Sequence, residues 1–477
     1  MTEGSHAQAR IRRTLLLAVL FSLGAGLVLN PLALNRAITR NVDLWWHLNT
    51  GAWIVRHHTL PATDPFTTIG GSQRWVAYSW LFQLSLFGFY RWFGLLGTVV
   101  YTVALVLAIA IALYHAIQAR WASFPGAIAL SAVGLVAMCR LYTARPWLFT
   151  ILFFIIEMDV LLAALDDPQG RGPSRRLWLL PLIFAVWANL HIQFVYGLAL
   201  LGLAALTQDL GVFVGPKGAR ITRTPYALGR VLWAVAGVSF LATLLSPSSW
   251  RVYAVILGLT KQRVPYRTVM ELMPPTFYEP LDYVVVLIAL GGAFILGRAA
   301  VRYTVFAALL FVGETVAFLH VVRDQWMVVV TVLLLAAVTF GRSSRPAAPL
   351  PGIQRMAAVA IAVLFLVLLG KARGISNADL EARVANTYPT KAAETVSQRA
   401  LPGPLFNDFN WGGYLEWRLP QLRALIDSRM NVGGDDLIQR TGDTWACLGE
   451  WKTNPDLAAA NLVIGGRRFL WLIQMDE

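Results

Sequence analysis

Long apolar runs constrain this chain more than any other feature of its sequence. A helix that crosses a membrane needs about 20 apolar residues, and the chain repeatedly offers runs close to that length. The runs that we expect to span lie at residues 14–34, 97–117, 124–142, 146–165, 177–190, 192–209, 230–246, 281–298, 303–320, 325–341 and 356–371. The chain is therefore predicted to be mainly α-helical, a polytopic membrane helix bundle of about eleven spans.

The composition agrees with a membrane protein and excludes other classes. Hydrophobic residues make up 57% of the 477 residues and charged residues only 14%, with a mean hydropathy of +0.58. Soluble domains carry roughly a quarter charged residues, so an ordinary soluble enzyme and a disordered chain are excluded. The two cysteines set no disulfide framework, and no Cys/His spacing predicts a metal site.

The orientation in the membrane depends on one ambiguous stretch, residues 75–93. It is amphipathic and rich in aromatic residues, which is typical of a helix lying in the membrane interface, although a span is the alternative. If it lies flat, the N-terminus is inside and nearly every short inner connector is basic, as the positive-inside rule requires. The inner basic residues are then Arg10, Arg12, Arg13, Arg120, Arg171, Arg175, Arg176, Lys217, Arg220, Arg223, Arg298, Arg302, Arg342, Arg345 and Arg355. We adopt this orientation, with an uncleaved first span.

Three longer segments are then predicted to face the outside. They are a first outer loop at residues 35–96, a second loop at about 247–280, and the C-terminal tail, residues 372–477. We divide the chain into a transmembrane domain, residues 1–371, and an extracytoplasmic domain, residues 372–477. The tail has charged residues, Gly-Gly turns and short apolar runs, which are typical of a small soluble α/β domain.

Unusual polar residues gather at this predicted outer face. Most of the histidines lie there, together with acids and arginines at helix ends, which indicates a cavity open to the outer leaflet. The alternative is that polar residues simply favour helix ends, but this does not explain why the two sides differ. The candidates for substrate binding are Trp45, Trp46, Asp64, Arg140, Arg145, Asn189, His191, Gln193, Glu271, His320 and Arg323.

Asp43 is the sharpest candidate, because it comes just after the first span. On a helical turn Asp43, Trp46 and His47 share one face, and a carboxylate beside an imidazole in apolar surroundings suits a general base. We therefore predict Asp43 and His47 as catalytic residues, with the indoles of Trp45 and Trp46 offering a face to a sugar ring. The alternative is an interfacial anchor, in which tryptophans form a membrane belt, Asp43 caps a helix and His47 is solvated.

Asp64 and two arginines also allow two interpretations. Asp64 lies in a turn that it is expected to cap. Arg140 and Arg145 flank an outer turn, where they either hold a lipid phosphate or pyrophosphate or extend to lipid headgroups.

A polar break and a polar turn supply the remaining candidates. The apolar run breaks at Asn189, His191 and Gln193, and such a break is tolerated where it lines a cavity or is packed in protein. At another outer turn Arg323 has Asp324 as its expected local partner.

With these residues in place, the chain resembles the GT-C superfamily of membrane glycosyltransferases. An acidic residue follows the first span in a long outer loop that continues along the interface, a plan shared by protein O-mannosyltransferases and lipid A aminoarabinose transferases. More closely, the chain resembles bacterial membrane proteins of that superfamily through three motifs. They are Asp43-Leu-Trp-Trp-His47, Trp187-Ala-Asn-Leu-His191, and Phe406-Asn-Asp-Phe-Asn-Trp-Gly-Gly-Tyr414 followed by Ile426-Asp-Ser-Arg429.

The resemblance implies a reaction and partners. Such enzymes take a sugar from a polyprenyl-phosphate donor, whose lipid tail lies between helices, and transfer it to a lipid, glycan or protein acceptor at the outer face of the membrane. A carboxylate in the first outer loop deprotonates the acceptor, and the anomeric configuration inverts. On this chain the implied base is Asp43, and Arg145, Arg323 and His191 are candidates for the donor phosphate. The implied location is a bacterial inner membrane.

The chain departs from the better-known members in its acidic residues. It lacks a second carboxylate beside Asp43, an Asp-x-Asp pair in the first loop, and a His-Pro-Pro element in the interfacial helix. The oligosaccharyltransferase branch uses a divalent metal, but these departures favour a metal-free site, and no cofactor is expected.

Other functions compete with glycosyl transfer. The main alternative is a non-catalytic protein on a GT-C-like scaffold, which binds lipid or assembles with partners through its outer segments. A transporter is disfavoured because no inverted repeat or matched pair of broken helices is evident. A nucleic-acid binder is disfavoured because the arginines are dispersed among the inner loops.

The predicted orientation has a direct test. A reporter fused after Arg176 should give a cytoplasmic signal, because this connector is basic and follows an even number of spans when residues 75–93 lie flat. An extracytoplasmic signal at that position would contradict the orientation.

Overall fold

The computed structural model describes residues 3–72, 74–121, 123–166, 175–210, 226–298, 304–341 and 351–466. Four predicted inner connectors, at residues 167–174, 211–225, 299–303 and 342–350, lie outside the described residues, as does the apolar run at 469–473. The chain divides into two compact units, each built from three segments. Unit 1 comprises Met1–Ala33, Thr102–Pro247 and Glu271–Gly374; unit 2 comprises Leu34–Tyr101, Ser248–Met270 and Ile375–Glu477.

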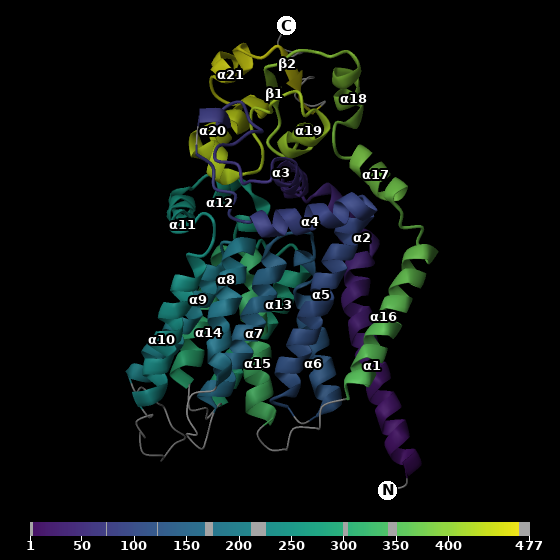
Figure 1. Cartoon of the computed structure of the whole chain (residues 1–477), viewed down its shortest axis with the longest axis vertical. Coiled ribbons are helices and arrows are strands. Elements are labelled where there is room, and N and C mark those ends of the chain that lie inside the picture. The colour runs from purple at the N-terminus through teal and green to yellow at the C-terminus, as the bar shows by residue number, and fades with distance from the viewer. Residues whose placement is uncertain are drawn as a thin grey trace. The chain divides into compact units, whose positions relative to one another are not determined.

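Unit 1 is a bundle of apolar helices that run side by side (Figure 1). Its helices are α1 (Glu3–Leu29), α6 (Phe124–Ala137), α7 (Trp147–Leu165), α8 (Leu180–Leu190), α9 (Phe194–Asp209), α10 (Tyr226–Thr243), α13 (Pro280–Arg298), α14 (Thr304–His320), α15 (Gln325–Gly341) and α16 (Gly352–Ala372), together with most of α5 (Leu95–Gln118). Short 3₁₀ turns lie at Cys139–Leu141 (η2), Arg175–Leu179 (η3) and Val322–Asp324 (η5). Each predicted apolar run therefore falls on a helix.

Six of the described helices are long and apolar enough to cross a membrane, and four more are shorter and apolar. The chain is a multi-pass membrane protein, while the count of eleven spans stays a prediction. Helix α15 forms the core of unit 1, since it is buried along nearly its whole length and packs on α6, α13 and α14. A helix that is apolar all round is expected to be buried in this way.

The first apolar run ends earlier than the predicted residue 34. Helix α1 ends at Leu29, and a second helix, α2 (Pro31–Thr39), begins after one residue. Pro31 has no N–H for the helical ladder, and Asn30 stabilises the break. Its side chain donates to the carbonyl of Leu27 at 2.6 Å and accepts from the N–H of Ala33 at 3.0 Å.

The ambiguous stretch at residues 75–93 forms a short helix, α4 (Trp80–Phe93), preceded by non-helical residues. Its 14 residues reach about 21 Å, whereas the hydrocarbon core of a bilayer is roughly 30 Å thick. Helix α6, which lies on a predicted span, has the same length, so length alone does not decide the matter, and the flat orientation of α4 stays a prediction.

Unit 2 gathers the three segments that the charge pattern assigns to one side. Its elements are α3 (Asp43–His57), η1 (Gly70–Ser72), α4, α11 (Arg251–Lys261), α12 (Pro265–Thr268), α17 (Asn377–Ala385), α18 (Thr390–Gln398), β1 (Leu405–Asn407), α19 (Gly412–Arg418), α20 (Met430–Trp445), η6 (Trp451–Thr453), α21 (Pro455–Ala458) and β2 (Leu462–Ile464). Strands β1 and β2 pair in parallel, with Leu405 opposite Leu462. A further turn, η4 (Met270–Leu272), lies at the boundary between the units.

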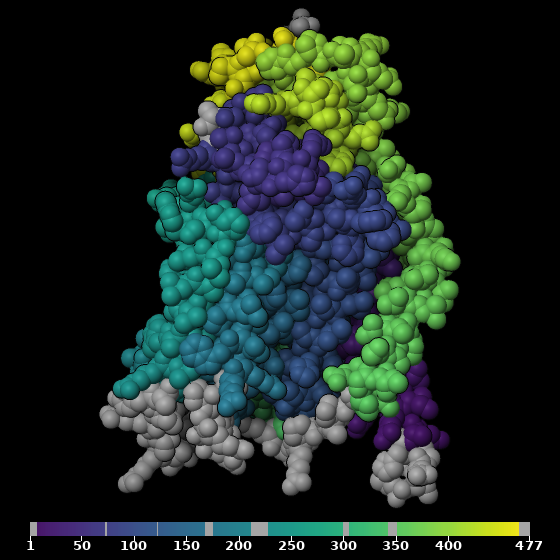
Figure 2. Space-filling model, in the orientation of Figure 1, coloured from purple at the N-terminus to yellow at the C-terminus, as the bar shows by residue number. Residues whose placement is uncertain are grey.

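Backbone and side-chain hydrogen bonds tie the tail to both loops. The N–H of Thr68 donates to the carbonyl of Ala424 at 2.9 Å, and the N–H of Arg263 donates to Asp435 at 2.7 Å. Figure 2 shows the first loop and the tail meeting within unit 2. The tail therefore folds together with the predicted outer loops and does not form a unit by itself.

Close packing of α3 on α4 depends on Gly51. A Cβ added there would lie 2.6 Å from the Cβ of Phe87 and closer still to the carbonyl oxygen of Gln83. We expect Gly51→Ala to destabilise unit 2 by about 1–3 kcal/mol, because overpacking forces helices apart. The measurement is the thermal unfolding midpoint of the solubilised protein.

A glycine on the partner helix provides the matched control. Gly88 lies on α4, and a Cβ there would meet nothing within 4 Å. Gly88→Ala should leave the midpoint unchanged or raise it, since alanine favours helix. Equal effects of the two substitutions would contradict the packing argument.

Candidate functional site

Asp43 is the first residue of α3, and the tail holds its carboxylate. The N-cap residue is Val42, which makes no side-chain capping hydrogen bond. Ser428 donates its hydroxyl to Oδ1 of Asp43 at 2.5 Å, and Asp43 is half-buried. Asp43 is therefore a first-turn acid, a position favoured by the helix dipole, and not the cap that the anchor alternative required.

The aromatic residues beside Asp43 pack inside unit 2. Trp45 meets the rings of Tyr388 and Tyr414 edge-on, with centroids 5.6 and 5.0 Å apart. The ring of Trp46 lies 3.7 Å from the ring of His47, and His47 is only 2% exposed. A membrane belt with a solvated histidine does not describe this helix. The same burial leaves little of either indole available to stack on a sugar ring.

A buried ionic cluster lies at the centre of unit 2. Arg429 donates to Oδ1 of Asp64 at 2.7 Å and to Oδ2 of Asp427 at 2.6 Å. Its Nη2 atom lies 3.9 Å from Oε1 of Glu416. All four side chains are almost fully buried. Asp427 and Arg429 thus pair within the tail, and Asp64 joins them from the first outer loop.

Asp64 also organises its own turn, as predicted. Its carboxylate accepts the N–H groups of Phe66 and Thr67 at 3.1 and 3.2 Å. The rings of Phe66 and Trp75 lie 5.2 and 4.6 Å from the guanidinium carbon of Arg429, within the range of a cation–π contact. The partners of Asp64 are thus protein groups that hold the loop on the tail.

Three carboxyl groups share one guanidinium in this cluster, so proton binding is favoured. Burial, and then the charge of Asp427, raises the pKa of Glu416 well above its usual value. Burial also raises the pKa of Asp427, although Arg429 opposes the shift. Burial lowers the pKa of Arg429, but the surrounding carboxylates outweigh it and raise that pKa overall. The cluster therefore stabilises the charged form of Arg429 and disfavours the ionised form of Glu416.

In unit 1, two predicted arginines meet at one acid. Arg145 lies 3.3 Å from Oε1 of Glu271, and Arg323 lies 3.7 Å from the same oxygen. Both guanidinium groups lie near the ring of Trp147, at 5.0 and 5.8 Å from its centroid. Arg323 also lies 3.9 Å from Asp324, its expected local partner. Guanidinium groups are common partners of phosphate and carboxylate oxygens in proteins.

The polar break between α8 and α9 joins this region through Asp324. Gln193 donates to Oδ1 of Asp324 at 3.3 Å, and the hydroxyl of Tyr196 donates to Oδ2 at 3.0 Å. His191 pairs with the hydroxyl of Thr150 at 2.8 Å. The break is thus packed in protein, which is one of the two contexts that tolerate it.

The other predicted residues of unit 1 have separate surroundings. Arg140 pairs with Asp282 at 2.5 Å, so the structure gives Arg140 and Arg145 different acidic partners. Asn189 donates to the carbonyl of Ala185 at 2.7 Å. His320 is exposed at the end of α14. Of the predicted site residues in unit 1, the structure therefore brings Arg145 and Arg323 together at Glu271, while Arg140, Asn189 and His320 lie apart from them.

The motif in the tail packs unit 2 together. Asn407 donates to the carbonyl of Ile426 at 2.8 Å and accepts the N–H of Leu425 at 2.8 Å. A Cβ at Gly413 would lie 3.1 Å from the backbone nitrogen of Trp46. Glycine at this position therefore allows α19 to approach α3 closely.

Sequence reasoning missed several polar groups. Ser428 was not recognised as the partner of Asp43, because 385 residues separate them in the chain. Glu157 and Glu314 are buried acids within apolar helices of unit 1, and Thr331 donates to Glu314 at 3.0 Å. Here a signal was present, since an acid within an apolar run is costly and merits attention.

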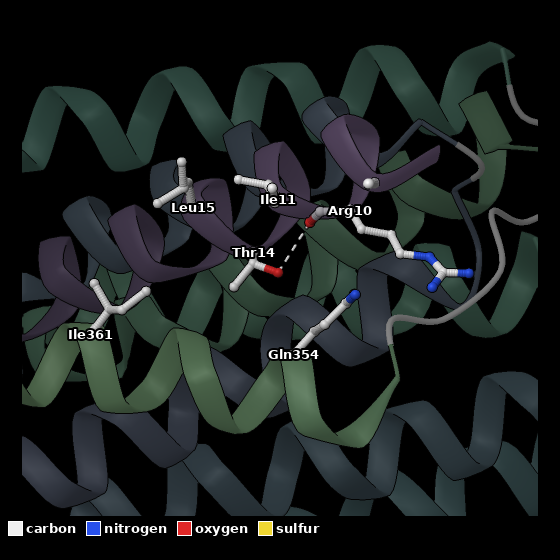
Figure 3. Close-up of a pocket in the computed structure, with 7 residues that line it drawn as sticks. Arg10, Ile11, Thr14, Leu15, Gln354 and Ile361 are labelled. Atoms are coloured by element: carbon white, nitrogen blue, oxygen red, sulfur yellow. Dashed lines mark hydrogen bonds between the residues drawn. The ribbon is translucent and has the colours of Figure 1, made fainter. Parts of the chain in front are cut away.

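The cavity in Figure 3 contains none of the predicted site residues. It measures about 370 Å³ and lies between α1 and α16 in unit 1. Ile11, Leu15 and Ile361 give it an apolar lining, while Thr14 donates to the carbonyl of Arg10 at 3.0 Å. Within the described ranges, no group of three His, Cys, Asp or Glu side chains is arranged to hold a metal ion.

Comparison with known proteins shows which solved structures have a similar fold. No sequence-family model and no curated protein sequence matches the chain. Among the solved structures that match is the oligosaccharyltransferase AglB from Archaeoglobus fulgidus in complex with an inhibitory peptide and a dolichol-phosphate, which is 11% identical over 88% of this chain with a TM-score of 0.50. The apo form of the oligosaccharyltransferase from the same organism is 10% identical over 89% of this chain, also with a TM-score of 0.50. The alignment covers 65% of each of those chains. This likeness shows that the chain has a fold similar to that of these oligosaccharyltransferases.

Removal of the central cation of the cluster tests its importance. Arg429→Gln should destabilise unit 2 by about 3–5 kcal/mol, because buried carboxyl groups lose their only cationic partner in the cluster. Carboxyl groups with a raised pKa stabilise the fold at low pH and lose that contribution as the pH rises through the raised pKa. The destabilisation should therefore be larger at pH 8 than at pH 5, measured as the shift in unfolding midpoint.

Arg418 is the control for this experiment. It lies 3.7 Å from Glu394, and both side chains are about half exposed. Arg418→Gln should cost less than about 1 kcal/mol at either pH. A pH-independent loss in Arg429→Gln would contradict the protonation argument.

Proposed function

We propose that this chain is a membrane glycosyltransferase of the GT-C type. It transfers a sugar from a polyprenyl-phosphate donor to an acceptor at the outer face of a bacterial inner membrane, with inversion. The observation that carries the proposal is the placement of Asp43. In a chain with an oligosaccharyltransferase-like fold, this half-buried carboxylate begins α3 in the segment that follows the first apolar helix, and Ser428 orients it.

Asp43 acts as the general base in this proposal. Its carboxylate takes the proton of the acceptor hydroxyl, whose oxygen forms a bond to the anomeric carbon. The bond from that carbon to the phosphate oxygen breaks, and the polyprenyl phosphate leaves with the electron pair. The hydrogen bond from Ser428 orients the carboxylate of Asp43. His47 packs against Trp46 and acts through the position of this helix.

Arg145 and Arg323 are the candidates for the donor phosphate in this proposal. Arg145 and Arg323 share Glu271, and a lipid phosphate that displaces one contact to that acid gains charge-assisted hydrogen bonds. His191 is a further candidate. No step is assigned to a metal, and the acceptor is a lipid, a glycan or a protein. AglB was solved with a peptide and dolichol-phosphate, and the proposal extends only the lipid-phosphate part of that chemistry to this chain.

The proposal predicts a severe defect in Asp43→Asn. Transfer from a labelled polyprenyl-phosphate sugar, measured with protein reconstituted in liposomes, should fall by about 100-fold or more, because general-base catalysis contributes roughly that factor. Ser428→Ala should cause a smaller loss. The carboxamide is nearly isosteric with the carboxylate, so the unfolding midpoint should change little.

Asp379 provides the matched control. It lies on α17 in unit 2 and pairs with Arg383 at 3.0 Å on the surface of that helix. Asp379→Asn should retain full transfer. Full transfer by Asp43→Asn would end the assignment and favour the non-catalytic alternative, in which deletion of the tail abolishes function while Asp43→Asn does not.

A further inference from the structure

Unit 2 contains a cavity of about 290 Å³ that includes none of the predicted site residues. One wall is a single face of α3, because Asn49, Trp53, Arg56 and His57 follow helical spacing. The remaining lining residues come from the turn around Asp64 and from α19 and the loop after it: Pro65, Phe66, Glu416, Pro420, Gln421, Leu422 and Arg423. The cavity is therefore built from the first loop and the tail together.

The lining is mainly polar, and its rim is cationic. Arg56 and Arg423 are exposed, and neither forms an ion pair with another side chain in the part of the chain that the structure describes. Glu416 is the only acid in the lining. This residue is only 3% exposed and lies 3.9 Å from the guanidinium of Arg429, whereas both arginines of the rim are exposed. The cavity thus favours an anionic ligand.

The same lining carries groups that recognise a sugar. Trp53 is stacked with His57 at a ring-centroid distance of 4.1 Å, and the imidazole Nδ1 lies 2.8 Å from the carbonyl oxygen of Trp53. These contacts hold a flat aromatic wall in place. Asn49 and Gln421 offer amide groups that both donate and accept hydrogen bonds to hydroxyls.

The size of the cavity narrows the choice of ligand. Pockets for drug-sized molecules begin at about 300 Å³, so a cavity at the lower limit accommodates a small ring and excludes a folded peptide. A lipid tail is disfavoured by the polar lining. A free inorganic anion would use the arginines but not the amide groups and the indole wall.

We propose that this cavity binds an acidic sugar unit, a pyranose that carries a carboxylate, with Arg56 and Arg423 on the carboxylate and Asn49 and Gln421 on the hydroxyls. This inference rests on the proposed function, because it identifies the acceptor of the transfer reaction as an acidic glycan. The binding itself requires no transfer. Asp43 does not line the cavity, so the two proposals can fail separately.

Calorimetric titration of the solubilised full-length protein tests the proposal with methyl β-glucuronide. Methyl β-glucoside, which lacks the carboxylate, should bind at least about tenfold more weakly, and Arg56→Ala and Arg423→Ala should each lose a similar factor. Arg399→Ala, at an exposed arginine of unit 2 outside the cavity, should bind as the natural protein does. Asp43→Asn should also bind the glucuronide normally.

Three results would overturn the proposal. They are equal affinity for glucoside and glucuronide, no binding of the glucuronide, or competition by inorganic phosphate as strong as that by the glucuronide itself. The last result would identify a general anion site. Normal glucuronide binding together with full transfer by Asp43→Asn would instead refute the general base and leave the sugar pocket standing.

Discussion

The buried guanidinium of Arg429 is the interaction on which the arrangement of unit 2 depends. It joins Asp64 of the first loop to Asp427 and Glu416 of the tail, and it lies against the rings of Phe66 and Trp75. A charge taken out of water is costly unless it is paired and hydrogen-bonded. The first loop and the tail must therefore fold against each other to satisfy this group, and neither segment completes the cluster alone.

The neighbouring residue in the chain transmits that constraint to the proposed chemistry. Ser428 lies directly before Arg429, and its hydroxyl holds the carboxylate of Asp43. Once Arg429 is fixed between Asp64 and Asp427, the backbone at Ser428 is fixed as well, and the position of Asp43 follows. Gly412 and Gly413 let α19 approach its neighbours closely, so the same packing orders the helix on which Asp43 lies.

The local features of the fold could be predicted from the sequence. Every predicted apolar run falls on a helix, because length and hydropathy decide this locally. The turn cap of Asp64 and the pair of Asp427 and Arg429 are also local, since only a few residues separate the partners. The three segments assigned to the outer side by charge fold into one unit, while the orientation in the membrane stays a prediction.

The long-range contacts could not be predicted in this way. Arg429 lies 365 residues from Asp64 in the chain, and the local sequence around either residue does not indicate the other as its partner. The buried environment of Glu416 likewise arises from tertiary packing. The burial of Trp45, Trp46 and His47 differs from both sequence interpretations for the same reason, because Tyr388 and Tyr414 of the tail cover Trp45.

The central claim is that Asp43 faces the reacting carbon of a lipid-linked sugar. The most direct measurement is an experimental structure of the full-length protein in lipid, determined with a non-hydrolysable polyprenyl-phosphate sugar analogue. We expect the anomeric carbon to lie beside the carboxylate of Asp43. A sugar phosphate bound away from Asp43, with Ser428 and Asp43 still paired, would contradict it.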